Sequence, residues 1–307
     1  MRDSMTAVRT VTPENISFAG VAGNRLAGDL WISGDAGSKP TALLLHGGGQ
    51  TRRAWDRAAR DLADAGFAAI TVDQRGHGES DWLADGAYAF ADYGADAVQL
   101  GRQIAERFGQ MPVVIGASLG GLAAMLAEGE AGPGFWQGLV LVDITPQMDP
   151  EGVDKIQSFM GAAMAEGFAS VEEAAEAVAA YLPHRPRPKS LDGLRKNLRH
   201  DPDGRYRWHW DPRFLDGPRS INTDGAQLEG ATSDALRATR IPVLLVRGAS
   251  SELISPAHAQ AFQAIVPHAE TVDVGGAGHM VAGDRNDIFS AAICSFLTKT
   301  AGKRAGQ

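Results

Sequence analysis

Apolar residues recur along the chain with two periods, one typical of buried strands and one typical of amphipathic helices. Short, mainly apolar runs of this kind predict strands, the central ones buried on both faces of a parallel sheet. The predicted strands are 41–45, 68–72, 113–115, 138–143, 241–246 and 270–274. Segments with apolar residues at helical spacing lie between several of them, namely 53–65, 92–108 and 122–126. The alternation predicts an α/β protein with a mostly parallel sheet and helices on both faces.

Two regions depart from this alternation. Residues 15–21 and 25–32 are two short strand patterns joined by a turn, and they predict an antiparallel edge. Between 145 and 240 no buried-strand run occurs, and the pattern predicts helices at 153–164 and 171–182. We therefore expect a core made of 1–144 and 241–307, with 145–240 inserted as a mainly helical cap.

An aromatic stretch stands out in this insertion. Tyr206, Trp208 and Trp210 alternate with basic residues, as they would on one face of a short strand. The rings either pack onto the core of the cap or line a substrate pocket beneath it. We take all three as candidate substrate-binding residues.

The first candidate catalytic segment is Gly116-Ala117-Ser118-Leu119-Gly120, which follows a predicted apolar strand and leads into a predicted helix. A serine between a strand and a helix in such a tight turn exposes its hydroxyl above the helix N-terminus, and the glycines allow strand and helix to approach closely. Ser118 is the candidate nucleophile.

Three further glycine-rich segments follow predicted strands. His46-Gly47-Gly48-Gly49 can present backbone N–H groups without obstruction, while 73–80 predicts a tight loop in which Arg75 and His77 have mainly structural roles. Gly278-His279 follows the last strand. Among the histidines, His279 is the best candidate for a general base, because it arrives at the same sheet edge as Ser118.

Composition narrows the range of partners. With 307 residues, 44% of them hydrophobic, the chain can bury a large core, and its net charge of −8 disfavours binding to nucleic acid or anionic membranes. The single cysteine, Cys294, excludes an intrachain disulfide. Neither metal-ligand spacing, a signal peptide nor a membrane span is evident. We expect a cytoplasmic monomer or homo-oligomer that acts on a small molecule without metal or cofactor.

Together, His46-Gly47-Gly48, the Asp73-x-Arg75-Gly76-x-Gly78-x-Ser80 loop, the Ser118 turn and Gly278-His279 resemble the α/β-hydrolase family, in its cap-bearing branch. The resemblance covers nearly the whole chain. It implies eight strands, with nucleophile, acid and histidine on the loops after the fifth, seventh and eighth, and the cap after the sixth. It also implies an oxyanion hole formed by the N–H groups of Gly48 and Leu119, with Gly49 as an alternative to Gly48.

The acid departs from the family pattern. An Asp usually follows the glycine that ends the seventh strand by three residues, but here that position is Ser251. The downstream motif of the family, an acid followed by Leu253-Ile254-Ser255-Pro256, selects Glu252 instead. We therefore expect Ser118, His279 and Glu252 as the catalytic triad, with Asp143 at the end of the sixth strand as the alternative acid.

The identity of the residue at the nucleophile position, Ser118, limits which reactions the protein can catalyse. Relatives that open epoxides or displace halide use an aspartate there, so Ser118 favours acyl transfer to water. We expect a serine hydrolase that cleaves a carboxylic ester or lactone of a small, mainly apolar substrate. The alternatives are carbon–carbon bond hydrolysis, peracid formation and, in another class, a non-catalytic small-molecule receptor.

Overall fold

The core of the protein is an eight-stranded sheet with the order β1-β2-β4-β3-β5-β6-β9-β10. The computed structural model describes residues 11–34, 39–183, 185, 187, 190–223 and 225–304. β2 runs antiparallel to both of its neighbours, and the remaining pairs are parallel. The strands are β1 (Glu14–Ala19), β2 (Arg25–Trp31), β3 (Thr41–Leu45), β4 (Ala68–Val72), β5 (Val113–Ala117), β6 (Gly138–Val142), β9 (Val243–Gly248) and β10 (Glu270–Val274). This confirms the predicted α/β architecture and its antiparallel edge.

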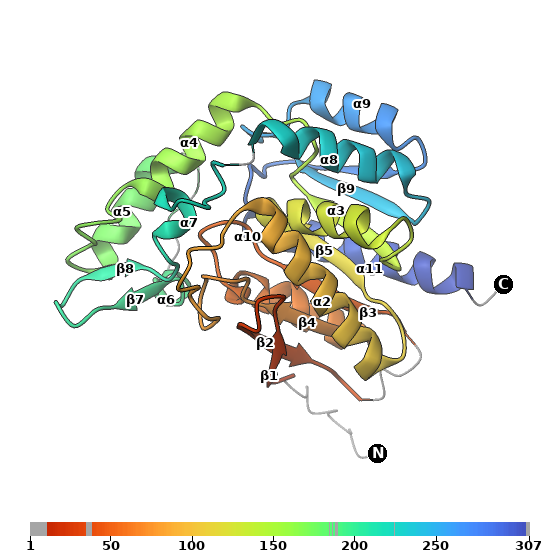
Figure 1. The fold of residues 1–307 in the computed structure, drawn as a ribbon, viewed down its shortest axis with the longest axis horizontal. Coiled ribbons are helices and arrows are strands. Elements are labelled where there is room, and N and C mark those ends of the chain that lie inside the picture. The colour runs from red at the N-terminus through yellow and green to blue at the C-terminus, as the bar shows by residue number, and fades with distance from the viewer. Residues whose placement is uncertain are drawn as a thin grey trace, which may run out of the picture.

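Helices cover both faces of the sheet (Figure 1). On one face α2 packs against α3, and α3 packs against α8; on the other α1 packs against α11. A 3-10 helix, η1, connects the loop after β3 to α1, and α9 lies between β9 and β10. The bounds are η1 (Arg52–Trp55), α1 (Asp56–Asp64), α2 (Phe90–Phe108), α3 (Leu119–Ala131), α8 (Gly225–Ala238), α9 (Pro256–Ile265), α10 (Val281–Asp284) and α11 (Asn286–Arg304).

The strand side chains alternate between two hydrophobic cores. On β3, Leu43 and Leu45 belong to the core shared with α2 and α3, whereas Ala42 and Leu44 belong to the core shared with α1 and α11. All four are buried. Because successive strand residues point to opposite faces, burial on both sides requires a continuous apolar run. Each buried leucine contributes about 2 kcal/mol through removal of apolar surface from water.

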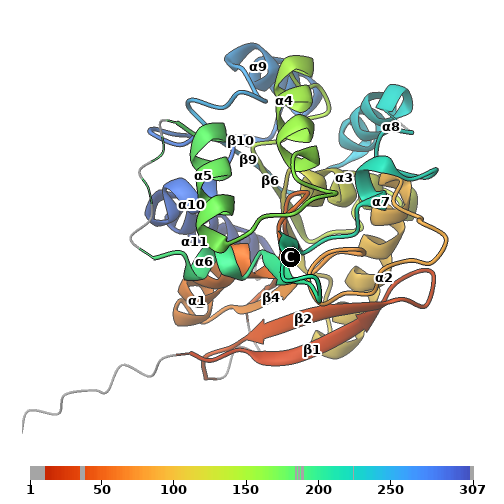
Figure 2. The same cartoon turned by 90° about the vertical axis from the view of Figure 1, so that its left-hand side faces the viewer.

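The segment predicted as a cap lies at one end of the sheet, over the carboxyl ends of the parallel strands (Figures 1 and 2). It contains a two-stranded hairpin as well as helices, so it is less uniformly helical than the sequence pattern predicts. Its elements are α4 (Pro150–Gly161), α5 (Val171–Tyr181), α6 (Asp192–Arg195), β7 (Leu198–His200), β8 (Tyr206–Trp208) and α7 (Arg213–Asp216).

The last helix of the predicted insertion belongs to the layer on the sheet. α8 packs against α3 and α9, and its Leu228 and Leu236 join the same core as the strand residues. We therefore propose a shorter cap, which extends from α4 to α7. Among the described residues, no helix has the length and apolar content that a membrane crossing requires.

Candidate active site

Ser118 occupies a strained turn between β5 and α3. Its backbone has φ 45° and ψ −113°, a left-handed conformation that non-glycine residues rarely adopt. The flanking glycines have no room for a side chain: a Cβ on Gly116 would lie 2.4 Å from the Gly120 carbonyl oxygen, and one on Gly120 would lie 2.3 Å from that of Leu45. The glycines therefore permit the close strand–helix approach that the sequence predicts.

His279 pairs with Asp143. The distance between His279 Nδ1 and Asp143 Oδ2 is 2.8 Å, and the aspartate side chain is fully buried. Since a carboxylate accepts, Nδ1 carries the proton and Nε2 is left with a lone pair. A histidine held in this tautomer is ready to act as a general base through Nε2.

Asp143 is fixed by more than the histidine. It follows β6 directly in a left-handed conformation, φ 51°. Its Oδ1 accepts the N–H of Gly248 at 2.8 Å, and its Oδ2 also accepts the Ser251 hydroxyl at 2.5 Å. Ser251 stands at the position where the family pattern expects an Asp. The carboxylate comes here from the neighbouring strand, and the serine at the usual acid position helps to hold it.

Glu252 makes a side-chain hydrogen bond to the cap, and none to His279 is found among the described residues. Its Oε1 accepts the hydroxyl of Tyr181, at the end of α5, over 3.2 Å. The loop after β9 therefore directs Ser251 toward Asp143 and Glu252 toward the cap. His279 instead contacts Asp143, the alternative acid of the sequence analysis, and we therefore propose Asp143 rather than Glu252 as the acid.

The glycine loop after β3 offers one free backbone donor next to Ser118. The N–H of Gly47 donates to Gln50 Oε1 at 3.1 Å, and the N–H of Gly49 donates to His77 Nε2 at 3.2 Å. Among the described residues, the N–H of Gly48 has no such partner. A Cβ on Gly47 would lie 3.5 Å from Ser118 Cβ, which places the loop beside the serine. The geometry thus favours Gly48 over Gly49 as an oxyanion donor.

Leu119 provides the second candidate donor. It is the first residue of α3, where backbone N–H groups have no acceptor within the helix. No partner for its N–H is found in the part of the chain that the structure describes. The N–H groups of Gly48 and Leu119 thus remain available to a developing negative charge.

Two buried histidines lie behind the glycine loop. His46 Nδ1 donates to the Gly47 carbonyl at 2.8 Å, and its Nε2 accepts the Gln74 N–H at 3.0 Å. Both His46 and His77 have no exposed surface. Burial lowers the pKa of His46 to about 4, and burial together with the nearby His46 lowers that of His77 to about 3. Both imidazoles are therefore neutral at pH 7.

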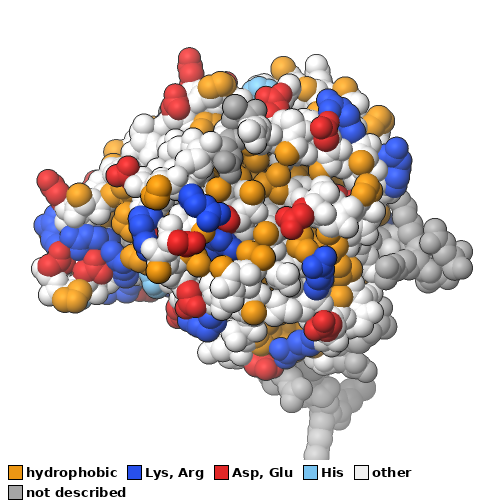
Figure 3. Space-filling view, in the orientation of Figure 1, with side chains coloured by type: hydrophobic (Ala, Val, Ile, Leu, Met, Phe, Trp, Pro, Cys, Tyr) orange, Lys and Arg blue, Asp and Glu red, His pale blue; other side chains and the backbone are white. Residues whose placement is uncertain are grey.

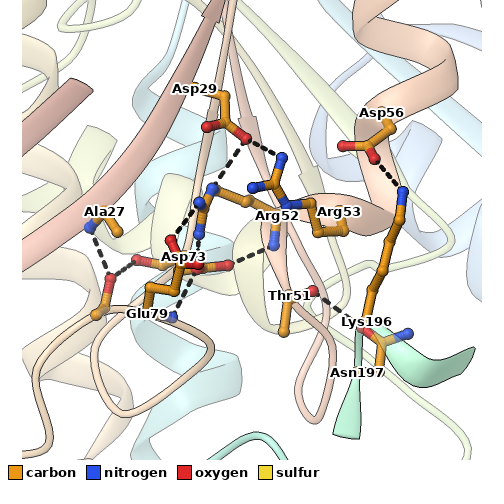
Figure 4. Close-up of polar contacts among 11 residues, drawn as sticks. Ala27, Asp29, Thr51, Arg52, Arg53, Asp56, Asp73, Glu79, Lys196 and Asn197 are labelled. Atoms are coloured by element: carbon orange, nitrogen blue, oxygen red, sulfur yellow. Dashed lines mark hydrogen bonds and ion pairs between the residues drawn. The ribbon is translucent and has the colours of Figure 1, made fainter. Parts of the chain in front are cut away.

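A buried ion cluster fixes the other end of the same loop (Figure 4). Arg52 bonds to Asp29 at 2.9 Å, to Glu79 at 2.5 Å and to Asp73, whose Oδ1 also accepts the backbone N–H of Arg52. Asp29 and Asp73 are fully buried and Arg52 nearly so. The cluster connects β2, the loop after β4 and the start of η1, so it anchors the chain just after the glycine loop.

Two side chains of the cap cover the glycine loop. A Cβ on Gly48 would lie 3.2 Å from Phe214 Cζ, and one on Gly49 would lie 2.9 Å from Met160 Cε. Met160 comes from α4 and Phe214 from α7. The sequence analysis did not single out either residue. Phe214 ends the aromatic stretch at 205–214, and that proximity was the available signal.

The three aromatic residues chosen from the sequence pack mainly within the cap. The Tyr206 ring lies 4.6 Å from that of His200, and the Trp208 ring lies 5.3 Å from that of Phe168. Trp210 is buried, with its ring 5.9 Å from that of Phe214. These contacts favour the packing interpretation for Tyr206 and Trp208. Trp210 supports Phe214 from behind.

A cavity lies outside this group of residues. It measures about 450 Å³ and lies between α3 and α8, with Leu126, Gly129 and Ala235 in its lining. Figure 3 shows this face of the molecule, where hydrophobic side chains lie among charges of both signs. None of the residues proposed for chemistry lines it. The described residues contain no group of three His, Cys, Asp or Glu side chains placed to hold a metal ion.

Comparisons with known proteins show which family and which fold the chain is similar to. The model of a family described as serine aminopeptidase, S33, matches residues 37–286. An esterase of Mycobacterium tuberculosis is 30% identical over 254 residues, which cover 81% of this chain and 80% of that protein. A 2-(acetamidomethylene)succinate hydrolase of Mesorhizobium japonicum is 31% identical over 272 residues, which cover 86% of this chain and 90% of that protein. The crystal structure of an α/β hydrolase from Novosphingobium aromaticivorans has a TM-score of 0.77 and 25% identity, and the match covers 94% of this chain and 99% of that chain.

Proposed function

Because the chain belongs to the α/β-hydrolase family, we propose that it is a serine hydrolase that cleaves a carboxylic ester or lactone of a small, mainly apolar substrate. The observation that carries the proposal is the pairing of His279 Nδ1 with Asp143 at 2.8 Å in a chain whose Ser118 stands in a strained strand–helix turn. The related esterase supports the reaction class.

The mechanism proceeds through an acyl-enzyme. His279 Nε2 takes the proton of the Ser118 hydroxyl as Oγ attacks the carbonyl carbon, and Asp143 stabilises the resulting imidazolium. The N–H groups of Gly48 and Leu119 bind the tetrahedral oxyanion, where each donor contributes about 3 kcal/mol. The imidazolium then protonates the leaving alcohol. Water, activated by the same histidine, attacks the acyl-enzyme and releases the acid and the free serine.

The substrate preference rests on the cap. Met160 and Phe214 stand over the glycine loop, and both are apolar and nearly buried. Such a roof favours an apolar acyl or alcohol group, since contact removes its surface from water. Neither metal nor cofactor is part of the proposal, because the serine, the histidine and the acid supply nucleophile and proton transfer by themselves.

The experiment is hydrolysis of a panel of aryl esters, alkyl esters and lactones by the purified protein and by Ser118→Ala. We expect the variant to lose turnover by about 10³-fold or more while it keeps its fold. A fluorophosphonate should add once to the wild-type chain, at Ser118, and the adduct should be located by peptide mass spectrometry. Turnover by Ser118→Ala at the wild-type rate would contradict the mechanism.

The same panel separates the alternatives. A carbon–carbon bond hydrolase would act on diketone-type acids in preference to esters, and a perhydrolase would form peracid when hydrogen peroxide is added. An amide or aminoacyl anilide tests for the peptidase activity that the family description names. A non-catalytic receptor would turn over none of these compounds. Preference for the esters and lactones supports the proposed function.

A further inference from the structure

His77 makes a contact with the glycine loop that reaches the proposed oxyanion hole. Its Nε2 is 3.2 Å from the backbone nitrogen of Gly49, the residue after the proposed donor Gly48. We propose that His77 is a positioning residue for the oxyanion hole: it holds the Gly49 N–H, fixes the peptide that follows Gly48 and leaves the N–H of Gly48 as the free donor of the loop. The inference rests on the proposed function, because it assigns a role within that mechanism.

Without such an acceptor, adjacent donors would compete. Gly47, Gly48 and Gly49 have three consecutive N–H groups, and glycine backbones rotate more freely than any other. Gln50 Oε1 takes the first N–H and His77 Nε2 takes the third. Gly49 also has φ 75°, a left-handed conformation that glycine adopts without strain. Within the described part of the chain, the middle N–H is the one of the three without an acceptor, so it is left for a ligand.

The tautomer of His77 follows from its other contact. Nδ1 lies 2.9 Å from the carbonyl oxygen of Arg75, which can only accept, so Nδ1 carries the proton. Nε2 therefore has a lone pair directed at Gly49. The ring is fully buried, so no water replaces this acceptor if it is lost. Protonation at Nε2 would turn the acceptor into a second donor facing the Gly49 N–H, and burial disfavours it.

The ring of His77 also joins the loop to the cap. It lies edge-on to Phe214, with the centroids 4.9 Å apart, and its backbone forms an antiparallel bridge with Trp210. The His46 ring lies 5.1 Å away on the other side. Phe214 in turn stands over Gly48. The imidazole is thus held from several directions, as a group that sets a backbone donor must be.

The test compares two substitutions of His77 that distinguish the effect of its aromatic ring from the effect of its hydrogen-bond acceptor. His77→Phe keeps an aromatic ring and removes the acceptor, whereas His77→Gln keeps an acceptor at the same distance along the side chain and removes the ring. For His77→Phe we expect kcat, corrected for folded protein, to fall by about 10- to 100-fold with little change in KM. An alkyl boronic acid, which mimics the tetrahedral intermediate at Ser118, should lose affinity by the same factor. His77→Gln should recover much of both.

Tyr93→Phe is the matched control. Tyr93 belongs to the same buried cluster, with its ring 6.4 Å from that of His77, but its hydroxyl contacts Arg75 and not the glycine loop. We expect kcat and boronic acid affinity to stay unchanged. A purely structural role of His77 would instead lower the stability of both His77 variants, while kcat per folded molecule stayed at the wild-type value, and that outcome would overturn the inference.

A measurement on the unaltered protein covers the case in which His77→Phe does not fold. In the ¹⁵N-labelled protein, an N–H···N bond should give a scalar coupling between the Gly49 amide nitrogen and His77 Nε2. Addition of the boronic acid should shift the Gly48 amide resonance and preserve that coupling. Absence of the coupling, or transfer of the large shift to Gly49, would overturn the positioning role. Loss of the proposed function is recognised separately, because Ser118→Ala would then retain turnover.

Discussion

At the scale of single residues, the most consequential contact is the one between His279 and Asp143. We predict that Asp143→Asn lowers kcat by about 10³-fold or more with KM nearly unchanged, because an amide can no longer hold Nδ1–H and stabilise the imidazolium. The carboxylate is fully buried, so no solvent ion substitutes for it. Steady-state kinetics on the preferred ester, with folded protein quantified by circular dichroism, measures the effect.

Glu252→Gln is the matched control for this prediction. Its Oε1 accepts the hydroxyl of Tyr181, and an amide oxygen can still do so. We expect kcat to fall less than about 5-fold, since this contact lies outside the proposed proton-transfer chain. A loss in Glu252→Gln that equals the loss in Asp143→Asn would restore Glu252 as the acid and remove the assignment made from the geometry.

The two neutral histidines behind the glycine loop predict how stability depends on pH. In the unfolded chain each binds a proton near its ordinary pKa of about 6.5, but in the folded protein only near 4 for His46 and 3 for His77. The unfolded state thus takes up more protons, and stability falls as the pH drops below 6.5. From pH 7 to pH 5 each histidine should remove about 2 kcal/mol from the free energy of unfolding.

Urea unfolding at several pH values measures this loss. The comparison with His77→Phe isolates one histidine. Between pH 7 and pH 5 the free energy of unfolding of that variant should fall by about 2 kcal/mol less than that of the wild-type protein. The other titratable groups are common to the two proteins, so the difference reports the imidazole of His77. Parallel curves for the two proteins would mean that His77 is protonated in the folded state as readily as in the unfolded chain.

At the scale of elements, the start of η1 depends on the buried cluster around Arg52. We predict that Arg52→Met destabilises the protein by about 3–5 kcal/mol, because Asp73 remains buried without its cation and Asp29 keeps only its pair with Arg53. Arg53→Met is the control: Arg53 also bonds Asp29, at 2.7 Å, but its side chain is 29% exposed. It should cost about 1 kcal/mol or less. Equal losses by urea unfolding would show that the buried cluster is not the main anchor.

The elements were predictable to different degrees. The continuous apolar runs, such as 41–45, located the central strands because burial on both faces leaves little choice of residue. The glycines around Ser118 located its turn because nothing larger fits there. The acid was not settled by the sequence, because spacing along one loop cannot show which neighbouring strand brings a carboxylate closer. Only the packed sheet places Asp143 and Ser251 side by side.

At the scale of the whole molecule, we propose that the cap limits which substrates reach Ser118. The sequence predicted an insertion at 145–240, and the packing of α8 against α3 is the reason that we propose an earlier end for it. It also pointed to the densest aromatic group, whereas the structure places Met160 and Phe214 over the glycine loop. Contacts between segments that are distant in the chain decide which cap residue faces inward. Hydrophobic periodicity is a local pattern and does not predict such contacts.

The position of Met160 in the cap leads to a prediction about substrate size. Met160 Cε would lie 3.7 Å from a Cβ on Gly48, so shortening this side chain opens space next to the proposed oxyanion hole. We expect Met160→Ala to raise kcat/KM for long acyl esters relative to short ones by about 10-fold, since one or two methylenes in an apolar pocket are worth about 1–3 kcal/mol.

Trp208→Leu is the control for this prediction, because its ring packs between Phe159 and Phe168 within the cap. It should lower stability by about 2 kcal/mol and change the rates for long and short esters in the same proportion. The ratio of kcat/KM across an ester series, with unfolding temperatures for both variants, decides the matter. If Trp208→Leu changed the ratio and Met160→Ala did not, the substrate would bind against the hairpin of β7 and β8, and α4 would serve only to close the cap.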